Sequence, residues 1–342
     1  MLKVGICTAL NQDTLKILNG AGIVSVVDFL KRDPEQLAQE LHIAYKNACS
    51  IRRVLLAEHA ASPVSAAALY QTALSLLTIL STGYESLDEL LDGGLYTGEL
   101  TQIAGDSGTG KTRICMCCAA TVVGTDGQSA VYIDTGSGFS AESLAALLTE
   151  DLNRLPLTER SETLLQSHLK HVNYIQTFDV FELLAVLDML ETEFKRQLLS
   201  GCQTLKLIVI DNIASVVQPI MGGPAGRSQG LLCHIGHRLK QMAVQFSVAV
   251  LVVNNMTSSY NGSLKRPALG KAWSHVPQTS LLIRRPQTTT ATSTTLMASS
   301  SCATPITVSQ EHSLREVCLI KSNRQQTPSV TTLALNRSDT AQ

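Results

Sequence analysis

The chain has 342 residues, which is more than one ordinary domain and fewer than three. Lysine and arginine number 27 against 28 aspartate and glutamate residues, so a net charge of −1 excludes a global basic field that would hold the chain on nucleic acid. Hydrophobic residues make up 44%, enough for a large buried core. No apolar run reaches the length of about 18 residues that would predict a membrane span.

The nine cysteines show no spacing typical of a zinc site. No C-x-x-C pair is followed by a second such pair or by a histidine pair, so reduced core thiols are the better interpretation. The odd number and the lack of a signal peptide favour a reducing environment. We therefore expect an intracellular protein.

Residues 1–59 have the pattern of short helices in a small N-terminal domain, whose possible role is contact with DNA or a partner. A helix is expected to begin near Asn11, and another at Asp33 and Pro34, because aspartate caps a first turn and proline fits it. This domain carries a group of basic residues: Lys46, Arg52 and Arg53. On charge alone, a solvated helix face is the better interpretation, and a phosphate-contacting patch is the alternative.

Residues 60–80 follow as a linker. The linker starts without a clear pattern around Pro63 and Val64 and then becomes apolar. An apolar linker that faces water alone is unusual, so we expect it to lie on another surface, within the chain or on a partner.

From residue 81 to residue 342, apolar runs alternate with helical runs. The expected strands are residues 102–104, 130–133, 171–175, 205–210 and 248–253. The expected helices are residues 113–123, 140–148, 180–199 and 231–246. This alternation predicts an α/β core with a mostly parallel sheet covered on both faces.

The end of the chain has a different pattern. Three late apolar runs are expected to close the sheet, at residues 281–284, 316–320 and 330–335. The segment from 286 to 305 between them is rich in threonine and serine and has little to bury. It is therefore predicted to be a disordered surface loop.

Residues 105–112 read G-x-x-x-x-G-K-T, the phosphate-binding loop motif, between a predicted strand and a predicted helix. Glycines let such a loop fold tightly and direct its backbone N–H groups at one anion. A glycine-rich turn that matches by chance is the weaker alternative, because both flanks fit. The predicted nucleotide-binding residues are Gly105, Asp106, Ser107, Gly108, Thr109, Gly110, Lys111 and Thr112.

Two residues of this loop and one distant carboxylate have predicted roles in catalysis and metal binding. Lys111 is expected to reach the outer phosphates, and the Thr112 hydroxyl to take one position on Mg²⁺. An apolar strand over residues 206–210 ends in Asp211, about a hundred residues after Lys111. Many buried strands end in aspartate, but in a phosphate-loop enzyme such an aspartate lies beside the Mg²⁺ shell.

Several sequence blocks around the motif resemble the RecA-like recombinase family in its eukaryotic branch. They lie, in order, at residues 81–99, 130–135, 207–211, 248–255 and 265–270. The helical N-terminal residues resemble the small helix-hairpin-helix domain of that branch. The resemblance is strongest to the recombinase paralogues, and among them to the D-type paralogue.

The resemblance implies a RecA-like ATPase core that uses ATP and Mg²⁺ and acts in homologous-recombination repair in the nucleus. It also implies partners, namely single-stranded or branched DNA, other paralogues in a hetero-oligomer, and the main strand-exchange recombinase. No membrane partner is expected.

Two departures from the family concern ATP hydrolysis. The family carries a glutamate two positions past the strand-end aspartate at 134, where it orients the attacking water; here that position is Gly136. A positioned base contributes about 10²–10⁴ in rate, so we expect ATP to turn over slowly. The family also senses the outer phosphate with a glutamine, and the equivalent here is the shorter Asn255. We expect weaker coupling between ATP and DNA.

Two further departures concern assembly and the N-terminal domain. Recombinase filaments form by docking a linker Phe-x-x-Ala into the neighbouring core, and the equivalent positions here are Val64 and Ala67. Valine buries less apolar area, so a mixed assembly is expected in place of long homopolymers. In the N-terminal hairpin turn, His42 stands where the family has glycine, which puts DNA contact by that turn in doubt.

Two core loops are implied by the resemblance to face DNA. The first, over residues 218–229, is glycine-rich, is expected to be flexible and contains Arg227. The second, over residues 256–271, contains Tyr260, Lys265 and Arg266. Cations and a stacking ring suit a single-strand groove, although either loop taken alone is better read as an ordinary surface loop.

The residues leave three functions open. The first is an ATP-binding paralogue with weak, DNA-stimulated ATPase activity that supports loading of the recombinase filament. The second is an active strand-exchange recombinase, which Gly136 and Val64 speak against. The third is a scaffold whose nucleotide is only structural.

Overall fold

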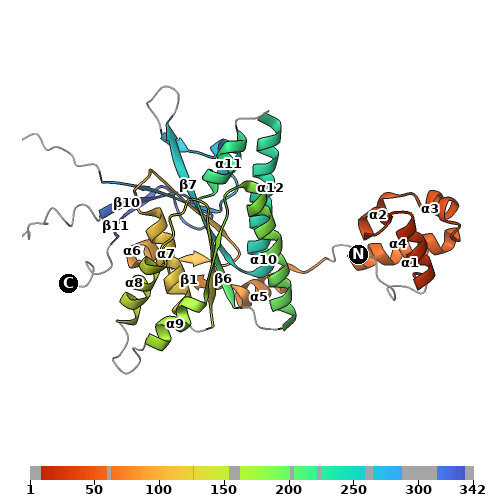
Figure 1. Cartoon of the computed structure of the whole chain (residues 1–342), viewed down its shortest axis with the longest axis horizontal. Helices are drawn as coiled ribbons and strands as arrows, with labels where there is room; N and C mark the ends of the chain where they lie inside the picture. The colour runs from red at the N-terminus through yellow and green to blue at the C-terminus, as the bar shows by residue number, and fades with distance from the viewer. Residues whose placement is uncertain are drawn as a thin grey trace, which may run out of the picture. The chain divides into compact units, whose positions relative to one another are not determined.

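The computed structural model describes residues 9–59, 63–125, 127–153, 162–200, 204–221, 225–258, 265–286 and 314–335. The chain divides into two compact units, Met1–Ala73 and Leu74–Gln342. The first is helical, and the second contains the sheet, as Figure 1 shows by the run of colour from red to blue. The predicted segment at 286–305 lies almost wholly outside the described residues, which resume at Leu314.

Short capped helices build the N-terminal unit. The Asn11 side chain accepts from Thr14 N, and Asp33 caps the helix that begins at Pro34, so both predicted starts are confirmed. A small core holds the unit together through Leu18, Phe29, Leu37, Ile51 and Leu55, among others. The helices are α1 (Gln12–Gly20), α2 (Val26–Lys31), α3 (Pro34–Leu41) and α4 (Tyr45–His59).

The turn after α3 has a backbone conformation that favours glycine, the residue that the resemblance predicts at this position. His42 ends that helix with a φ of 52°, in the left-handed region that glycine adopts most readily. The chain therefore keeps the turn's backbone conformation with a side chain in place. An exposed imidazole at this position occupies space that a glycine would leave open.

The predicted linker contains a helix that its composition did not reveal. α5 (Ala66–Leu76) begins after Ser65, whose hydroxyl accepts from Ala68 N at 3.2 Å. None of its described residues is buried. Leu69, Tyr70 and Leu74 are each more than half exposed, at 58%, 62% and 53%. The linker is thus helical, with apolar side chains open to solvent.

The second unit is built on a sheet of nine strands, in the order β11-β10-β9-β3-β7-β6-β4-β5, with β8 paired to β7. Strands β9, β3, β7, β6, β4 and β5 run parallel, while β10 and β11 add antiparallel strands at one edge. This confirms the predicted α/β class and the closing strands. The bounds are β3 (Leu100–Gly105), β4 (Ser129–Asp134), β5 (Val172–Gln176), β6 (Leu205–Asp211), β7 (Ala249–Ser258), β8 (Lys265–Pro267), β9 (Thr279–Arg284), β10 (Leu314–Lys321) and β11 (Ser329–Ala334).

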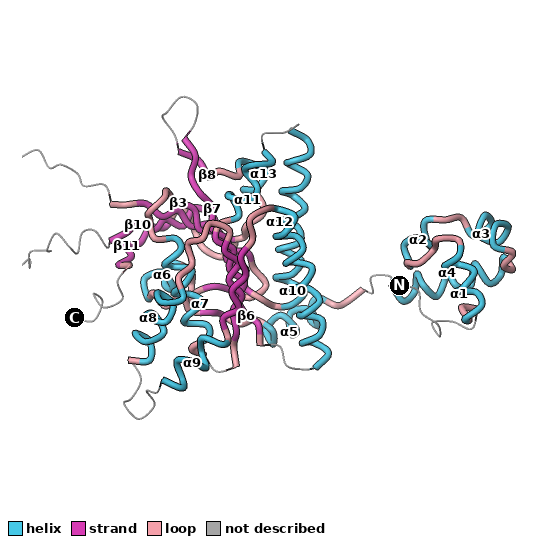
Figure 2. Tube along the Cα trace, viewed as in Figure 1, coloured by secondary structure: helices cyan, strands magenta, loops and turns pink. Residues whose placement is uncertain are grey.

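Helices cover both faces of this sheet, as Figure 2 shows with magenta strands between two groups of cyan helices. Side chains of β6 alternate between the faces, because successive residues of a strand point to opposite sides. Leu207 and Val209 join the core that contains α7, whereas Ile208 and Ile210 join the core that contains α10 and α12. Two buried layers therefore fix the sheet that carries the candidate site.

The helices are α6 (Glu85–Leu90), α7 (Lys111–Val123), α8 (Ala141–Leu152), α9 (Glu162–Lys170), α10 (Val180–Ser200), α11 (Ile213–Met221), α12 (Ala225–Phe246) and α13 (Gly270–Ser274), and a separate pair of strands is β1 (Ile79–Leu80) and β2 (Leu95–Tyr96). Within the described ranges, no helix has the length and apolar character needed to cross a bilayer.

The first predicted DNA-facing loop is mostly helical, which corrects its description as a flexible run. α11 continues to Met221, and α12 begins at Ala225. Val216 and Val217 are buried in the core beside α12, so packing carries the helix past Gln218. Arg227 lies in the first turns of α12, and its side chain is outside the described part of the structure.

Candidate nucleotide-binding site

The phosphate loop joins the buried strand β3 to α7, as the motif predicted. Gly108 and Gly110 have φ values of 72° and 90°, which side chains rarely adopt. A Cβ on Gly110 would lie 2.6 Å from a methyl carbon of Leu335, and one on Gly105 would lie 2.6 Å from the carbonyl oxygen of Ile283. Both the turn and its close neighbours therefore require glycine.

Lys111 is held over the loop by backbone carbonyls. Its ammonium donates to the carbonyl oxygens of Gly105 and Asp106 at 2.9 and 2.7 Å. Burial lowers the pKa of Lys111, while the nearby Asp211 and Asp106 carboxylates oppose that shift. A cation that burial penalises is stabilised by a bound anion, so the lysine fits the role of a phosphate ligand.

Asp211 ends β6 beside the first turn of α7. Burial raises the pKa of Asp211, and hydrogen bonds from Thr112 and Tyr132 oppose that shift. The Tyr132 hydroxyl donates to Asp211 Oδ2 at 2.9 Å. The structure thus brings Thr112 and Asp211 together. A hydroxyl and a carboxylate are oxygen ligands of the type that Mg²⁺ prefers, and a cation would offset the cost of burying the charge.

A cavity of about 480 Å³ lies between the loop and these strand ends. Asn255, on β7, is half-buried at its wall and pairs in register with Gly105 of β3. Asp211 and Asn255 line this cavity together with Lys111, so the outer phosphates are expected among these residues. The lining includes Ser107, Lys111, Thr112, Arg113, Asp211, Asn212, Asn255, Arg315 and Leu335.

The turn after β4 leaves space at Gly136, where the resemblance predicts that a glutamate is missing. The Asp134 carboxylate accepts from the backbone N–H groups of Gly136, Gly138 and Phe139 at 3.0, 3.3 and 3.1 Å. A Cβ built on Gly136 would have one described neighbour within 4 Å, the side-chain amide nitrogen of Asn212 at 3.8 Å. Glu142 lies in the first turn of α8, exposed, and is not part of the cavity wall.

Sequence reasoning missed two arginines that line the cavity. Arg315, on β10, is 9% exposed and donates through Nε to the Thr109 carbonyl at 3.1 Å. Burial and the neighbouring Arg285 lower the pKa of Arg315, so an anion there would be favourable. Arg113 donates through Nε to the Leu335 carbonyl at 2.8 Å.

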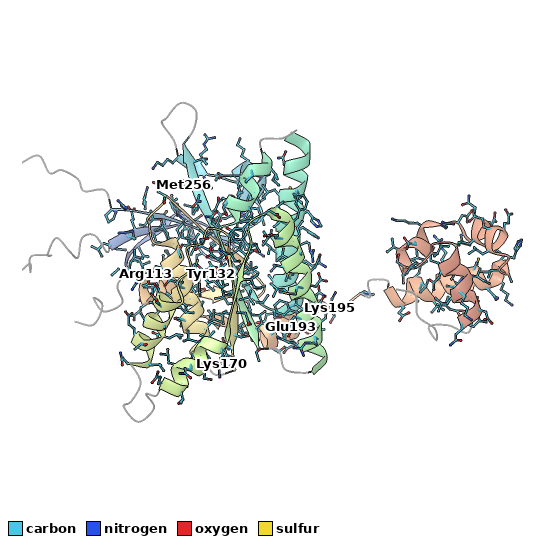
Figure 3. All side chains as sticks on the ribbon, in the orientation of Figure 1. Arg113, Tyr132, Lys170, Glu193, Lys195 and Met256 are labelled. Carbon is cyan, nitrogen blue, oxygen red and sulfur yellow. The ribbon has the colours of Figure 1, made fainter. Side chains whose placement is uncertain are left out.

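Their positions in the chain explain why they were missed. Arg113 directly follows the motif and lies on α7, where Figure 3 labels it. This position next to the motif could have predicted that Arg113 lines the cavity. Arg315 belongs to a strand far from the motif in sequence, and only the fold brings it to Thr109 in the loop. Tyr132 likewise meets Asp211 only through the pairing of β4 with β6. Figure 3 also labels Glu193 and Lys195, which lie on α10 and belong to the other face of the sheet.

The second predicted DNA-facing loop begins as a hairpin of β7 and β8. Lys265 pairs with Ser258 and places its ammonium 2.6 Å from Asp106 Oδ2, in an ion pair with the phosphate loop. Arg266 is exposed next to it. Tyr260 lies outside the described residues. The hairpin is therefore in direct contact with the predicted nucleotide site.

The other predicted contact residues belong to the first unit of the chain. Lys46, Arg52 and Arg53 are on α4 of the N-terminal unit, where Arg52 Nη1 donates to the Arg32 carbonyl at 2.9 Å. Val64 is 57% exposed, and Ala67 is exposed in the first turn of α5.

A parallel sheet, a phosphate loop after β3 and polar residues at the ends of β6 and β7 define the class of RecA-like ATPase cores. A family model described as Rad51 matches residues 74–305. A second model, described as the N-terminal domain of RAD51D, matches residues 1–58.

Curated relatives give the same result. DNA repair protein RAD51 homolog 4 of Bos taurus is 41% identical over 83% of this chain and 85% of its own length. The protein of that name from Mus musculus is 36% identical over 83% of this chain and 84% of its own length. DNA repair protein RAD51 homolog 2 of Homo sapiens is 29% identical over 80% of this chain and 78% of its own length. The chain belongs to the Rad51 family, as a paralogue with a RAD51D-type N-terminal domain, and the predicted resemblance is confirmed.

Proposed function

We propose that the chain is an ATP-binding paralogue that acts in homologous-recombination repair of DNA breaks in the nucleus. It binds Mg·ATP, hydrolyses it slowly and with stimulation by single-stranded DNA, and joins other paralogues in a complex that supports loading of the main recombinase filament. The cavity at the phosphate loop and Asp211 carries the proposal, because it provides ligands for a triphosphate, while Gly136, next to the cavity-lining Asn212, provides no carboxylate.

Four residues have roles at the triphosphate in this proposal. Lys111 holds the outer phosphates, and Asn255 contacts them at the end of β7. Thr112 and Asp211 hold Mg²⁺, which neutralises the phosphate charge when bound. Slow hydrolysis follows because Gly136 cannot accept the proton of the attacking water.

DNA binding is assigned to the β7–β8 hairpin. Arg266 is exposed there, and Lys265 connects the hairpin to Asp106 in the phosphate loop. A DNA backbone on this hairpin competes with Asp106 for the lysine, which gives DNA a route to the nucleotide site. Arg227 and the α4 residues Lys46, Arg52 and Arg53 are further proposed contacts.

Assembly with sister paralogues is assigned to two exposed features. The linker from Val64 through α5 presents apolar side chains, and the sheet ends in the edge strand β5. Beside that edge, Phe178 and Phe181 are 68% and 69% exposed. An unpaired edge next to apolar side chains suits an incoming segment of a neighbouring chain. A paralogue whose linker carries a stronger anchor than valine is the proposed occupant.

Calorimetry and single-turnover hydrolysis of the full chain, with and without single-stranded DNA and with Lys111→Ala as the control, test this function. The proposal expects stoichiometric Mg·ATP binding that the control lacks, and slow turnover that DNA accelerates. Binding without any turnover or DNA response would favour a structural nucleotide. Turnover as fast as that of an active recombinase would favour a strand-exchange enzyme.

A further inference from the structure

Asn212 directly follows Asp211 at the end of β6 and lines the same cavity as Lys111 and Asn255. Its side chain is half-buried, and no part of the phosphate-loop motif includes it. Its amide nitrogen is the described atom nearest to the open position at Gly136. The residue therefore lies beside the position at which the resemblance predicts a glutamate in the recombinases, but it carries an amide.

Neighbouring hydrogen bonds fix which end of this amide faces the cavity. Asn212 Oδ1 accepts from Ser215 N at 2.8 Å, where it caps the first turn of α11. The Thr135 hydroxyl holds the Asn212 backbone from the other side, donating to its carbonyl at 2.6 Å and accepting from its N–H at 2.8 Å. With its oxygen bound to the helix, the amide presents Nδ2 toward Gly136, at 3.8 Å from the Cβ position.

We propose that Asn212 is the water-positioning residue of this site, an inference that rests on the proposed ATP hydrolysis. The amide N–H donates to one lone pair of a water and leaves the other lone pair directed at the γ-phosphorus. The water oxygen forms the new bond to phosphorus, and the bond from phosphorus to the β–γ bridging oxygen breaks, with its electron pair leaving on ADP. The water's proton passes to an oxygen of the released phosphate.

This assignment explains slow turnover without a base. Phosphate-loop GTPases also orient the attacking water with a side-chain amide, which places the nucleophile without taking its proton. An amide nitrogen has no lone pair available for a proton, so Asn212 contributes orientation alone. A single uncharged hydrogen bond of this kind is worth about three- to tenfold in rate.

Asn212→Ser is the decisive variant. Serine caps helices as well as asparagine does, so the bond to Ser215 N is kept while the amide donor is removed. The inference expects kcat to fall about three- to tenfold, with unchanged thermal stability and ATP affinity. Asn19→Ser, on the exposed surface of α1, is the matched control and should leave every value unchanged.

The affinity for ADP with aluminium fluoride is a second measurement, which does not depend on turnover. This complex mimics the phosphoryl group in transfer together with its attacking water. Asn212→Ser should bind it about three- to tenfold more weakly than the wild type and bind ADP equally well. Equal aluminium fluoride affinity, or a loss of ATP binding in the variant, overturns the inference. A wild-type chain that binds no Mg·ATP contradicts the proposed function itself, so the two failures are distinguishable.

Discussion

Restoring a carboxylate at Gly136 is expected to accelerate ATP hydrolysis. The backbone of Gly136 does not have a positive φ, so a side chain adds no strain there. Its Cβ would meet Asn212 Nδ2 at 3.8 Å, an ordinary van der Waals contact. Gly136→Glu therefore adds a carboxylate next to Asn212, which lines the cavity with Lys111 and Asp211, without strain in the backbone.

The size of the expected rate increase follows from the general base that glycine cannot provide. A positioned general base contributes about 10²–10⁴ in rate, equivalent to about 3–5 kcal/mol of barrier. A glutamate introduced without matched neighbours is less well positioned than one that evolved there, so we expect an acceleration of about tenfold to a hundredfold. Replacing glycine at an unstrained position also stabilises the fold by about 0.4–1 kcal/mol, so loss of folding is not expected.

Single-turnover hydrolysis of bound ATP is the appropriate assay, because it separates cleavage from binding and product release. Gly136→Gln is the matched control, since glutamine has the same shape and no carboxylate. Only Gly136→Glu should hydrolyse ATP faster than the wild type, and its rate should increase with pH as the carboxylate ionises. If glutamate and glutamine variants turn over equally, the missing carboxylate is not what limits this site.

Four other changes test separate features. Asp211→Asn should raise the melting temperature of the nucleotide-free chain at neutral pH, because burial raises the pKa of Asp211 and penalises its charge. That penalty is complete above the raised folded pKa and disappears as the pH falls from there to the unfolded pKa, so the gain must shrink in acid. Val64→Phe should increase self-association in sedimentation, since a larger anchor buries more apolar area; an unchanged sedimentation profile counts against the linker assignment. Trp273→Phe breaks the buried bond from Nε1 to Gln102 Oε1, 2.7 Å long, and should cost about 1–3 kcal/mol in urea unfolding without changing ATP affinity. Lys265→Met should lower the salt slope of DNA binding by about one unit, and an identical slope would exclude this lysine from the DNA contact.

Residues with fixed chemical roles were predictable from sequence. The phosphate loop and Thr112 form one continuous motif, and Asp211 ends an apolar strand of the kind that such a site uses. The α/β class followed from the alternation of apolar and helical runs. These features are local, or repeat along the chain, so the order of residues is enough to find them.

Features that depend on tertiary packing were not predictable. The segment 218–229 reads as a flexible loop, yet α11 continues to Met221 and α12 begins at Ala225, with Val216 and Val217 packed into the core. Arg315 reaches Thr109 from a strand about two hundred residues away in sequence. Asn212 acquires a defined orientation only through Ser215 and the Thr135 hydroxyl of a neighbouring strand.

The account depends on a cavity that holds a triphosphate firmly and cleaves it poorly. Rapid-quench analysis of radiolabelled Mg·ATP, mixed with excess full-length chain, measures both properties in one experiment. We predict that the nucleotide is captured at the start and remains uncleaved through many turnover times of an active recombinase. ATP that stays free, or that is cleaved as soon as it is captured, would contradict the account.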